Sequence, residues 1–409
     1  MLLDSFPMIP VTEAIQIVLQ QTPQLPTESV SISHARGRIL SEEIVADTDL
    51  PPFDRAQMDG YAVRAKDIAN APASLKIVGE SAAGAGWHNK MNAGEAVRIM
   101  TGAPVPAGAD AVQQVELTRE IESGSQVEIL ESVEAGRSIV RRAAEIKSGE
   151  TVLRAGERIT TETIATLASF GYAQVKVGQR PRVAVMATGS ELVNVDEKPG
   201  ADQIRDSNNY TLAAYAAQSN ALVERLPLAG DHTEELKRQM ARAVETSDVL
   251  ITSGGVSVGV YDFTKAALKE LGAEIFFERV ALRPGKPTVF ARLGKTLVFG
   301  LPGNPVSVAV TFNLFARTAL RAMQGATDPM LAHERAVLAR DIKGSIDRES
   351  YLPAALRTNE KGSLIAEPLK WGGSSDFVSF ARAIALINVP AGDQKIAAGS
   401  VVRVVHLPN

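Results

Sequence analysis

The positions of hydrophobic and polar residues along the chain follow two different periods. Apolar residues recur at helical spacing over 10–21, 160–170, 209–219, 233–246, 262–271 and 305–321. Apolar runs typical of strands lie between these segments, at 183–186, 221–227, 248–252, 273–277 and 297–300. From residue 182 onward strands and helices alternate, and this alternation predicts a parallel sheet with helices on both faces.

The rest of the chain has a β-rich pattern. Short apolar segments separated by Gly and Pro occupy 46–140, and alternating stretches joined by Gly-rich turns occupy the last part of the chain. We therefore expect an α/β multidomain protein, with a central parallel-sheet α/β domain, flanking β-rich domains and a small C-terminal domain resembling a β-barrel. The expected boundaries are 1–45 plus 141–178 for an N-terminal linking domain, 46–140 for a β-rich domain, 179–327 for the α/β domain and 328–409 for the C-terminal domain.

Composition excludes several classes of protein and site. The 409 residues include no cysteine, so a disulfide framework, a Cys-based zinc site and a thiol nucleophile are ruled out. The formal net charge of −4 argues against a general nucleic-acid binder, but it leaves room for a local basic pocket. No run of about 18 apolar residues occurs and no basic region opens the chain, so we expect no transmembrane helix, no signal peptide and a cytoplasmic protein.

Polar, Gly-rich loops follow four of the predicted strands in the α/β domain. Ligands of parallel α/β sheets bind beyond the carboxyl ends of the strands, so these loops are the first candidates for a site. In three of them, hydroxyl groups, an amide and exposed backbone N–H groups could hold an anion. The candidate ligand-binding residues are Thr188 and Ser190; Ser253, Gly254, Gly255, Ser257 and Gly259; and Pro302, Gly303, Asn304, Pro305 and Ser307.

The fourth loop carries two cations, Arg283 and Lys286, on either side of Pro284-Gly285 with no acid between them. Such cations suit phosphate and other oxyanions. Each of the four loops also has a purely structural interpretation. In that interpretation, the loop at Thr188 and Ser190 is a tight turn, and Arg283 and Lys286 lie in a surface turn. Asp262 caps the helix that follows the loop of Ser253 through Gly259, and Pro305 is an ordinary residue of a first helical turn.

Common catalytic signatures are missing from the sequence. It contains neither a G-x-x-x-x-G-K-[ST] phosphate loop nor a G-x-S-x-G nucleophile elbow. Outside the α/β domain, Asp59 beside a glycine and Thr101 in a Gly/Pro loop are uninformative by themselves. The residues alone therefore predict an α/β enzyme or binding protein with an anionic ligand at a Gly-rich sheet edge.

Seven motifs, taken together and in this order, resemble the MoeA / gephyrin E-domain family of molybdopterin molybdenumtransferases, and the resemblance covers nearly the whole chain. The motifs are Pro52 through Val63, Arg98 through Pro106, Thr188 through Leu192, Asp206-Ser207-Asn208, Ser253 through Gly259, Pro284 through Pro287 and Leu301 through Ser307. One such motif is weak, whereas seven in the same order are highly specific.

The resemblance implies an enzyme that uses Mg²⁺ to insert molybdate into adenylyl-molybdopterin, with release of AMP and formation of molybdenum cofactor. It also implies a four-domain homodimer whose α/β domain binds the pterin and whose active site is shared between subunits. A contact with a molybdopterin adenylyltransferase belongs to the same expectation, whereas nucleic-acid and membrane partners do not. Matched by motif, the candidate residues are Asp59, Asp262, Lys286 and Arg283 for catalysis, Asp231 and Asp262 for Mg²⁺, and Thr101, Asp206 and Ser207 alongside the loops for substrate.

Two positions depart from the pattern of the family. Many members carry Gly-Glu-Asp-Ile where this chain has Ala143-Ala144-Glu145-Ile146, so Glu145, a further catalytic candidate, replaces an Asp and has one extra methylene. Arg283 occupies a place where lysine is frequent, and it keeps the charge while adding a planar fork. Alternatives to the transferase are a pterin-binding scaffold, a tungstate-inserting paralogue and a paralogue that binds pterin without turnover.

Overall fold

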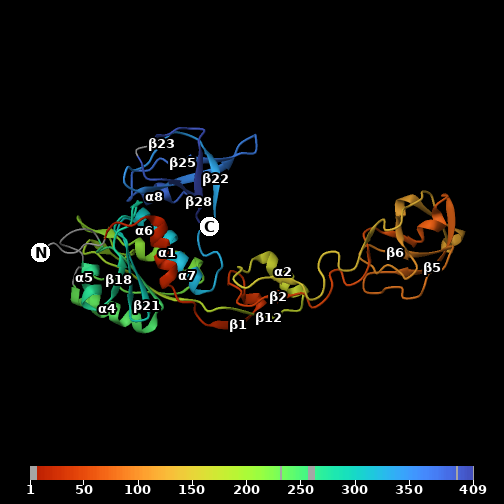
Figure 1. Cartoon of the computed structure of the whole chain (residues 1–409), viewed down its shortest axis with the longest axis horizontal. Coiled ribbons are helices and arrows are strands. Elements are labelled where there is room, and N and C mark those ends of the chain that lie inside the picture. The colour runs from red at the N-terminus through yellow and green to blue at the C-terminus, as the bar shows by residue number, and fades with distance from the viewer. Residues whose placement is uncertain (1–6, 231–232, 257–262, 393–394, 409) are drawn as a thin grey trace. The chain divides into compact units, whose positions relative to one another are not determined.

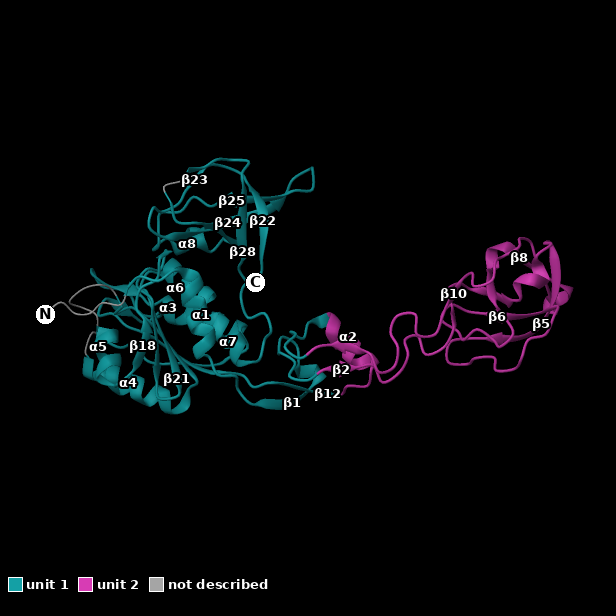
Figure 2. Cartoon of the chain, in the orientation of Figure 1, with its two compact units in different colours: residues 1–42, 155–161, 174–409 teal, residues 43–154, 162–173 magenta. Residues whose placement is uncertain are grey.

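The structure is a computed structural model that describes residues 7–230, 233–256, 263–392 and 395–408 (Figure 1). The chain divides into two compact units (Figure 2). Unit 1 comprises Met1–Glu42, Ala155–Thr161 and Gln174–Asn409, and unit 2 comprises Glu43–Arg154 and Glu162–Ala173. Unit 1 holds an α/β domain and a C-terminal β domain, whereas unit 2 is β-rich, so each unit is described by itself.

The α/β domain of unit 1 is built on a six-stranded sheet. Four strands run parallel in the order β16 (Leu222–Arg225), β13 (Arg182–Ala187), β17 (Val249–Ser253) and β21 (Thr296–Leu301). Every residue of β17 and β21 is buried, which explains their continuous apolar runs. The chain passes from β13 to β16 on one side and then to β17 on the other, so the topological switch point lies between β13 and β17.

The far edge of this sheet differs from the expected parallel arrangement. Strand β20 (Val289–Leu293) is antiparallel to β21, and β18 (Glu274–Phe277) is antiparallel to β20. The sequence pattern missed β20, which joins β21 through a tight turn where Gly294 has a φ of +62°. The α/β prediction is confirmed, with the correction that one edge of the sheet is mixed.

Helices cover both faces of the sheet (Figure 1). On one face α4 (Thr233–Thr246) and α5 (Phe263–Glu270) pack through residues such as Leu236 and Leu268. The other face is covered by α1 (Val11–Gln21), α3 (Asn208–Gln218), α6 (Pro305–Thr311), the π-helix η5 (Phe312–Ala316) and α7 (Arg317–Met323). The helix expected over 305–321 is thus divided by a π turn. In the described part of the chain, no helix is long and apolar enough to span a bilayer.

The C-terminal domain is a closed five-stranded barrel, as the sequence predicted. Its strands are β22 (His333–Leu338), β24 (Glu349–Thr358), β25 (Leu364–Pro368), β26 (Ala385–Val389) and β28 (Val401–His406). Closure results because β24 pairs with both β25 and β26. Strand β19 (Leu282–Arg283) of the α/β domain pairs in parallel with β24, so the backbone of Arg283 is fixed against the barrel. The short helix α8 (Phe377–Phe380) lies between β25 and β26.

Unit 2 is β-rich, in agreement with the sequence. Its main sheet has the order β7 (Ala111–Gln114), β4 (Gly60–Val63), β6 (Glu95–Ile99), β5 (Ala73–Ser81), β9 (Gln126–Ile129) and β8 (Thr118–Ile121). Two-stranded pairs join β2 (Ile44–Val45) to β11 (Thr151–Leu153) and β3 (Arg55–Ala56) to β10 (Ile139–Val140), and α2 covers Thr161–Ser169.

In unit 1, the remaining pairs are β1 (Thr27–Ser31) with β12 (Gln174–Gly178), β14 (Leu192–Val193) with β15 (Ile204–Arg205), and β23 (Ile342–Lys343) with β27 (Lys395–Ile396).

Candidate functional site

The predicted loops of the α/β domain meet around one cavity of about 910 Å³, here called the switch-point cavity. It lies where β13, β17 and β21 end, which is the position that the topology favours for a ligand. The predicted site residues that line it are Thr188, Asp206, Ser207, Ser253, Gly254, Gly255, Pro302, Gly303, Asn304 and Pro305. Apolar side chains, among them Leu192, Val256 and Phe377, complete a lining of mixed character.

Two adjacent glycines allow the loops to approach each other closely in this cavity. Gly254 has a φ of +91°, and a Cβ added there would lie 2.4 Å from the carbonyl oxygen of Thr188. Gly255 has a φ of +65°, and its Cβ would lie 2.4 Å from Thr264 Oγ1. Both positions therefore require glycine, for space as well as for backbone conformation.

Two buried polar atoms at the cavity have no hydrogen-bond partner among the described residues. Ser253 is 1% exposed, and its Oγ forms no hydrogen bond with the rest of the described chain. Asn208 Nδ2 donates to the carbonyl of Gly303 at 2.7 Å, while Asn208 Oδ1 is buried and unpaired in that part of the structure. Leaving such groups unsatisfied is unfavourable, so both atoms are suited to bind a polar ligand.

Among the described residues, the carboxylates of Asp206 and Glu191 also line the switch-point cavity. Asp206 is 3% exposed and accepts a hydrogen bond from the backbone N–H of Asn209 at 3.0 Å. Burial raises the pKa of Asp206 above its ordinary value, although the N–H groups of Asn209 and Asn208 and the charge of Arg225 act in the opposite direction. Desolvation dominates because the charged form of the carboxyl loses its water.

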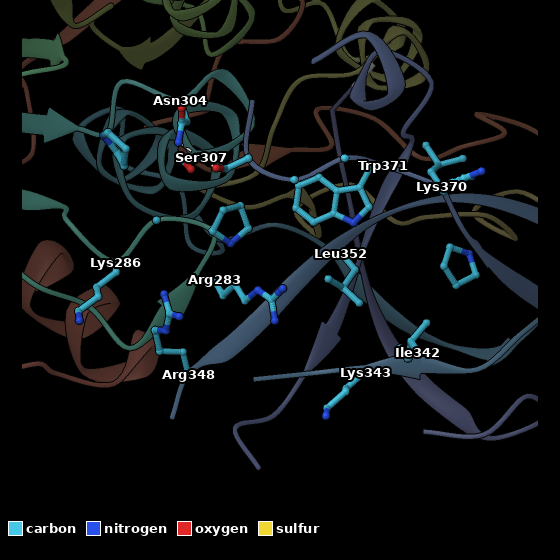
Figure 3. Close-up of a pocket in the computed structure, with 18 of the residues that line it drawn as sticks. Arg283, Lys286, Asn304, Ser307, Ile342, Lys343, Arg348, Leu352, Lys370 and Trp371 are labelled. Carbon is cyan, nitrogen blue, oxygen red and sulfur yellow. Dashed lines mark hydrogen bonds between the residues drawn. The ribbon is translucent and has the colours of Figure 1, made fainter. Parts of the chain in front are cut away.

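A second cavity, of about 870 Å³, is strongly cationic and is called the cationic cavity (Figure 3). The α/β domain contributes Arg283 and Lys286 to its wall. The barrel contributes further cations, which are Arg340, Lys343, Arg348 and Lys370. Among the described lining residues Asp341 is the one acid, and Lys395 Nζ pairs with it at 2.6 Å. The cavity therefore carries an excess of positive charge that favours an oxyanion.

The two cavities share part of their walls. Pro287, Pro302 and Asn304 line both of them. At this boundary Asn304 Nδ2 donates to Ser374 Oγ at 2.9 Å, and the N–H of Val306 donates to the carbonyl of Ser374 at 3.0 Å. A loop of the barrel thus closes the site of the α/β domain, and one ligand could extend from the mixed cavity into the cationic one.

Unit 2 contains three further predicted residues. Asp59 accepts hydrogen bonds from the backbone N–H of Thr101 at 2.7 Å and from Thr101 Oγ1 at 2.9 Å. These bonds hold the pKa of Asp59 below its ordinary value. Glu145 forms an ion pair of 3.5 Å with Arg55. Asp59 and Thr101 are therefore in contact, and the hydrogen bonds from Thr101 favour the ionised form of Asp59.

Known proteins resemble the chain along its whole length. Sequence models of the MoeA N-terminal region (domain I and II), a probable molybdopterin binding domain and the MoeA C-terminal region (domain IV) match residues 9–171, 184–322 and 335–407. A Bacillus subtilis molybdopterin molybdenumtransferase is 36% identical over 97% of this chain and 94% of its own length. A Staphylococcus epidermidis protein of the same name is 34% identical over 97% and 95%. The chain belongs to the molybdopterin molybdenumtransferase family.

A solved structure supports this assignment. The molybdopterin biosynthesis MoeA protein of Pyrococcus horikoshii OT3 has a TM-score of 0.82 and 28% sequence identity, and the match covers 98% of this chain and all of that one. The multidomain fold is therefore that of the family, whose curated members are enzymes. The region that matches the probable molybdopterin binding domain includes all the loops of the α/β domain that line the switch-point cavity.

Some predicted residues fall elsewhere. Ser307 lines the cationic cavity rather than the switch-point cavity. Ser190 is exposed and is not among the residues that line either cavity. Ser257, Gly259, Asp231 and Asp262 lie outside the described residues. Within the residues that the structure describes, no group of three or more His, Asp or Glu could hold a metal ion.

The contribution of the C-terminal barrel was not predicted from the sequence. Arg340, Lys370 and Ser374 line the cationic cavity although they lie far along the chain from the loops of the α/β domain. A signal was present, because Lys370-Trp371 is followed by Gly372-Gly373-Ser374-Ser375, a Gly-rich polar loop next to a cation. Glu191 and Asn208 were also missed as individual residues, although both lie in motifs that the analysis had singled out.

Proposed function

We propose that this enzyme inserts molybdate into adenylyl-molybdopterin, releasing AMP and forming molybdenum cofactor. The observation that carries the proposal is the boundary at Asn304, where a cavity of mixed polarity meets a strongly cationic one. The first cavity suits a pterin and its phosphate, and the second suits an oxyanion. The names of the Bacillus and Staphylococcus relatives agree with this assignment.

The two adjoining cavities would hold two anionic substrates that repel each other. Molybdate is a dianion, and it has to approach a substrate that is itself anionic because of its phosphates. Cations that line the cavity proposed for molybdate reduce this repulsion, which is large at short range in a partly buried site. Arg283 and Arg340 offer planar forks to oxyanions, whereas Lys286 adds a point charge.

For Mg²⁺, the donor set fits a site that includes the substrate. Mg²⁺ keeps several waters and takes one or two carboxylates together with substrate phosphates. Glu191 and Asp206 supply carboxylates at the switch-point cavity. Asp231 and Asp262 remain the ligands expected from their motif positions. We therefore propose that Mg²⁺ binds between carboxylates of this domain and the diphosphate, where it would neutralise developing charge.

The same proposal includes a cytoplasmic homodimer in which Asp59 reaches the active site of the partner subunit. Met58 and Met100, which are 46% and 44% exposed, flank Asp59 and Thr101 in sequence. Exposed apolar side chains next to a hydrogen-bonded carboxylate suit a surface that is covered by a partner. Because the pterin has to arrive already adenylylated, a contact with a molybdopterin adenylyltransferase would supply the substrate directly.

A defined-component assay tests the proposal. Purified protein, adenylyl-molybdopterin and Mg²⁺ are mixed with molybdate or tungstate, and AMP and active cofactor are measured together. We expect AMP release that depends on molybdate and is accompanied by cofactor formation. Tight pterin binding without AMP would favour the scaffold or the inactive paralogue, whereas AMP release with tungstate alone would favour the tungstate enzyme.

A matched pair of variants makes this assay specific for the site. Lys286→Ala removes a cation of the cationic cavity, and Arg242→Gln removes an exposed cation of α4. We expect the first substitution to abolish molybdate-dependent AMP release and the second to leave it unchanged. Equal activity of the two variants would contradict the role of the cationic cavity.

A further inference from the structure

A third cavity of unit 1, of about 190 Å³, is lined by three arginines that the proposed reaction does not use. Arg317 and Arg321 lie one turn apart on α7, and Arg158 lies on the segment Ala155–Thr161. Together with Gln218 and Asn220 at the end of α3, they form what is called here the arginine pocket. No acidic side chain is among the described residues that line it.

The three positive charges of the arginine pocket are poorly compensated. Arg317 is 9% exposed, and burial together with the charges of Arg321 and Arg158 lowers its pKa to about 10. Burial and Arg158 also lower the pKa of Arg321. Asp328 attracts both helix arginines, but in the described part of the chain it forms no ion pair with either of them. Like charges that face each other in this way are unfavourable unless an anion lies between them.

Most of the hydrogen-bond donors in the pocket are also unused. Each guanidinium has five N–H donors. Arg317 Nη1 makes one long hydrogen bond, of 3.4 Å, to the carbonyl of Pro329. The side chains of Arg321 and Arg158 donate to no other described residue. The pocket thus offers convergent charged donors, which is what tetrahedral oxyanions bind.

We propose that the arginine pocket binds a tetrahedral oxyanion of the size of inorganic phosphate, held by Arg158, Arg317 and Arg321. The volume of 190 Å³ is below the roughly 300–1,000 Å³ of sites for larger organic ligands, so it favours a small ion. This site is separate from the cationic cavity, since the two share none of their described lining residues.

The position of the pocket gives the anion a structural role. Gly37 lies near the point where the chain first leaves unit 1 for unit 2, after Glu42, and Arg158 lies near its first return, at Ala155. Asn220 Nδ2 donates a hydrogen bond of 2.6 Å to the carbonyl of Gly37, so the segment that leads to unit 2 is already bound to α3. An oxyanion would bind the returning segment, through Arg158, to α7. Its binding would therefore stabilise these two connecting segments against local unfolding.

Calorimetric titration of the full-length protein with inorganic phosphate in a chloride buffer tests the proposal. We expect a saturable binding event that Arg321→Gln weakens by at least about tenfold, because a charged hydrogen-bond partner is lost. Arg158→Gln, at an exposed side chain, should weaken it in the same direction. Arg340→Gln in the cationic cavity and Arg242→Gln on the surface should leave this event in place.

Thermal unfolding is a second measurement, and it distinguishes an arginine that binds an anion from one that only stabilises the fold. Without phosphate, Arg321→Gln should unfold at a higher temperature than the wild type, since the substitution relieves repulsion and desolvation. With phosphate, the unfolding temperature of the wild type should rise by more than that of the variant, because phosphate can still bind the cationic cavity in both proteins. The proposal is overturned if phosphate does not bind, if only Arg340→Gln removes binding, or if Arg321→Gln lowers the unfolding temperature equally with and without phosphate.

Discussion

Asn304 of the α/β domain donates a hydrogen bond of 2.9 Å to Ser374 Oγ of the C-terminal barrel. Asn304 lines both the switch-point cavity and the cationic cavity, so this contact lies where the two proposed ligands would meet. The carbonyl of Ser374 accepts a further hydrogen bond from Val306 at the start of α6. The barrel loop and the loop after β21 therefore form one wall of the site.

This contact predicts coupled effects of two substitutions. Asn304→Ala and Ser374→Ala should each reduce kcat/KM by about tenfold or more, because small displacements of positioned groups strongly affect a reaction. The double variant should be no worse than the more damaging single variant, since both remove the same contact. Steady-state kinetics of the three variants measure this coupling, and fully multiplicative losses would show that the two residues act independently.

The close approach at Gly254 predicts a stability effect that has a matched control. Gly294 and Gly254 both have positive φ, but a Cβ at Gly294 meets no atom within 4 Å. Gly294→Ala should therefore destabilise by about 1–2 kcal/mol through backbone strain alone. Gly254→Ala should destabilise by about 3 kcal/mol or more, because its Cβ also overlaps the carbonyl of Thr188. Denaturant unfolding of the two variants gives the comparison, and equal losses would contradict the steric argument.

The raised pKa of Asp206 predicts how stability depends on pH. The folded protein retains the Asp206 proton to a higher pH than the unfolded chain, so this contribution is fully present below the ordinary value of 3.8. It is lost as pH rises through the raised folded pKa. Asp206→Asn cannot ionise, so it should be more stable than the wild type at neutral pH, and the difference should disappear below pH 3.8.

Thermal unfolding as a function of pH measures this difference. Asp202→Asn is the control, because Asp202 is an exposed acid near Asp206. A neutral-pH stabilisation of the same size in both variants would attribute the effect to net charge rather than to burial of Asp206.

The charge of the cationic cavity predicts a selective effect on the oxyanion substrate. Arg340→Gln should raise KM for molybdate by about tenfold, since a charged hydrogen bond contributes about 1.5–3 kcal/mol. The KM for adenylyl-molybdopterin should change less, because Arg340 lines only the cationic cavity. Added salt should weaken molybdate binding more in the wild type than in this variant. A rise confined to the KM for the pterin would place molybdate elsewhere.

The proposed sharing of the active site predicts complementation between subunits. Asp59→Asn and Lys286→Ala remove residues of unit 2 and unit 1, respectively. If Asp59 acts on the partner subunit, randomly mixed dimers of the two inactive variants should recover about a quarter of wild-type activity, since half are heterodimers with one intact site. Activity after unfolding and refolding the variants together measures this recovery. Its absence, with dimers shown to exchange, would place Asp59 in the site of its own subunit.

Much of the fold was predictable because it follows from local periodicity. The helix over Thr233–Thr246 matches its prediction at both ends, and the fully buried strands β17 and β21 appear in the sequence as continuous apolar runs. Strand β20 was missed because its apolar run is short and includes Arg292, and its antiparallel direction depends on the turn at Gly294. The π turn at Phe312–Ala316 was hidden because its residues are buried like those of the helices on either side.

The sequence by itself determined the family, the α/β succession and the loops that carry chemistry. These are local properties, because strand, turn and motif are each encoded in neighbouring residues. Only the tertiary structure decided that Arg340, Lys370 and Ser374 of the barrel join Arg283 and Lys286, or that Arg158 faces Arg317 and Arg321. The first group of residues meets because β19 of the α/β domain pairs with β24 of the barrel. The second meets because segments that are distant along the chain pack on α7. Neither contact can be predicted from the spacing of residues in the sequence.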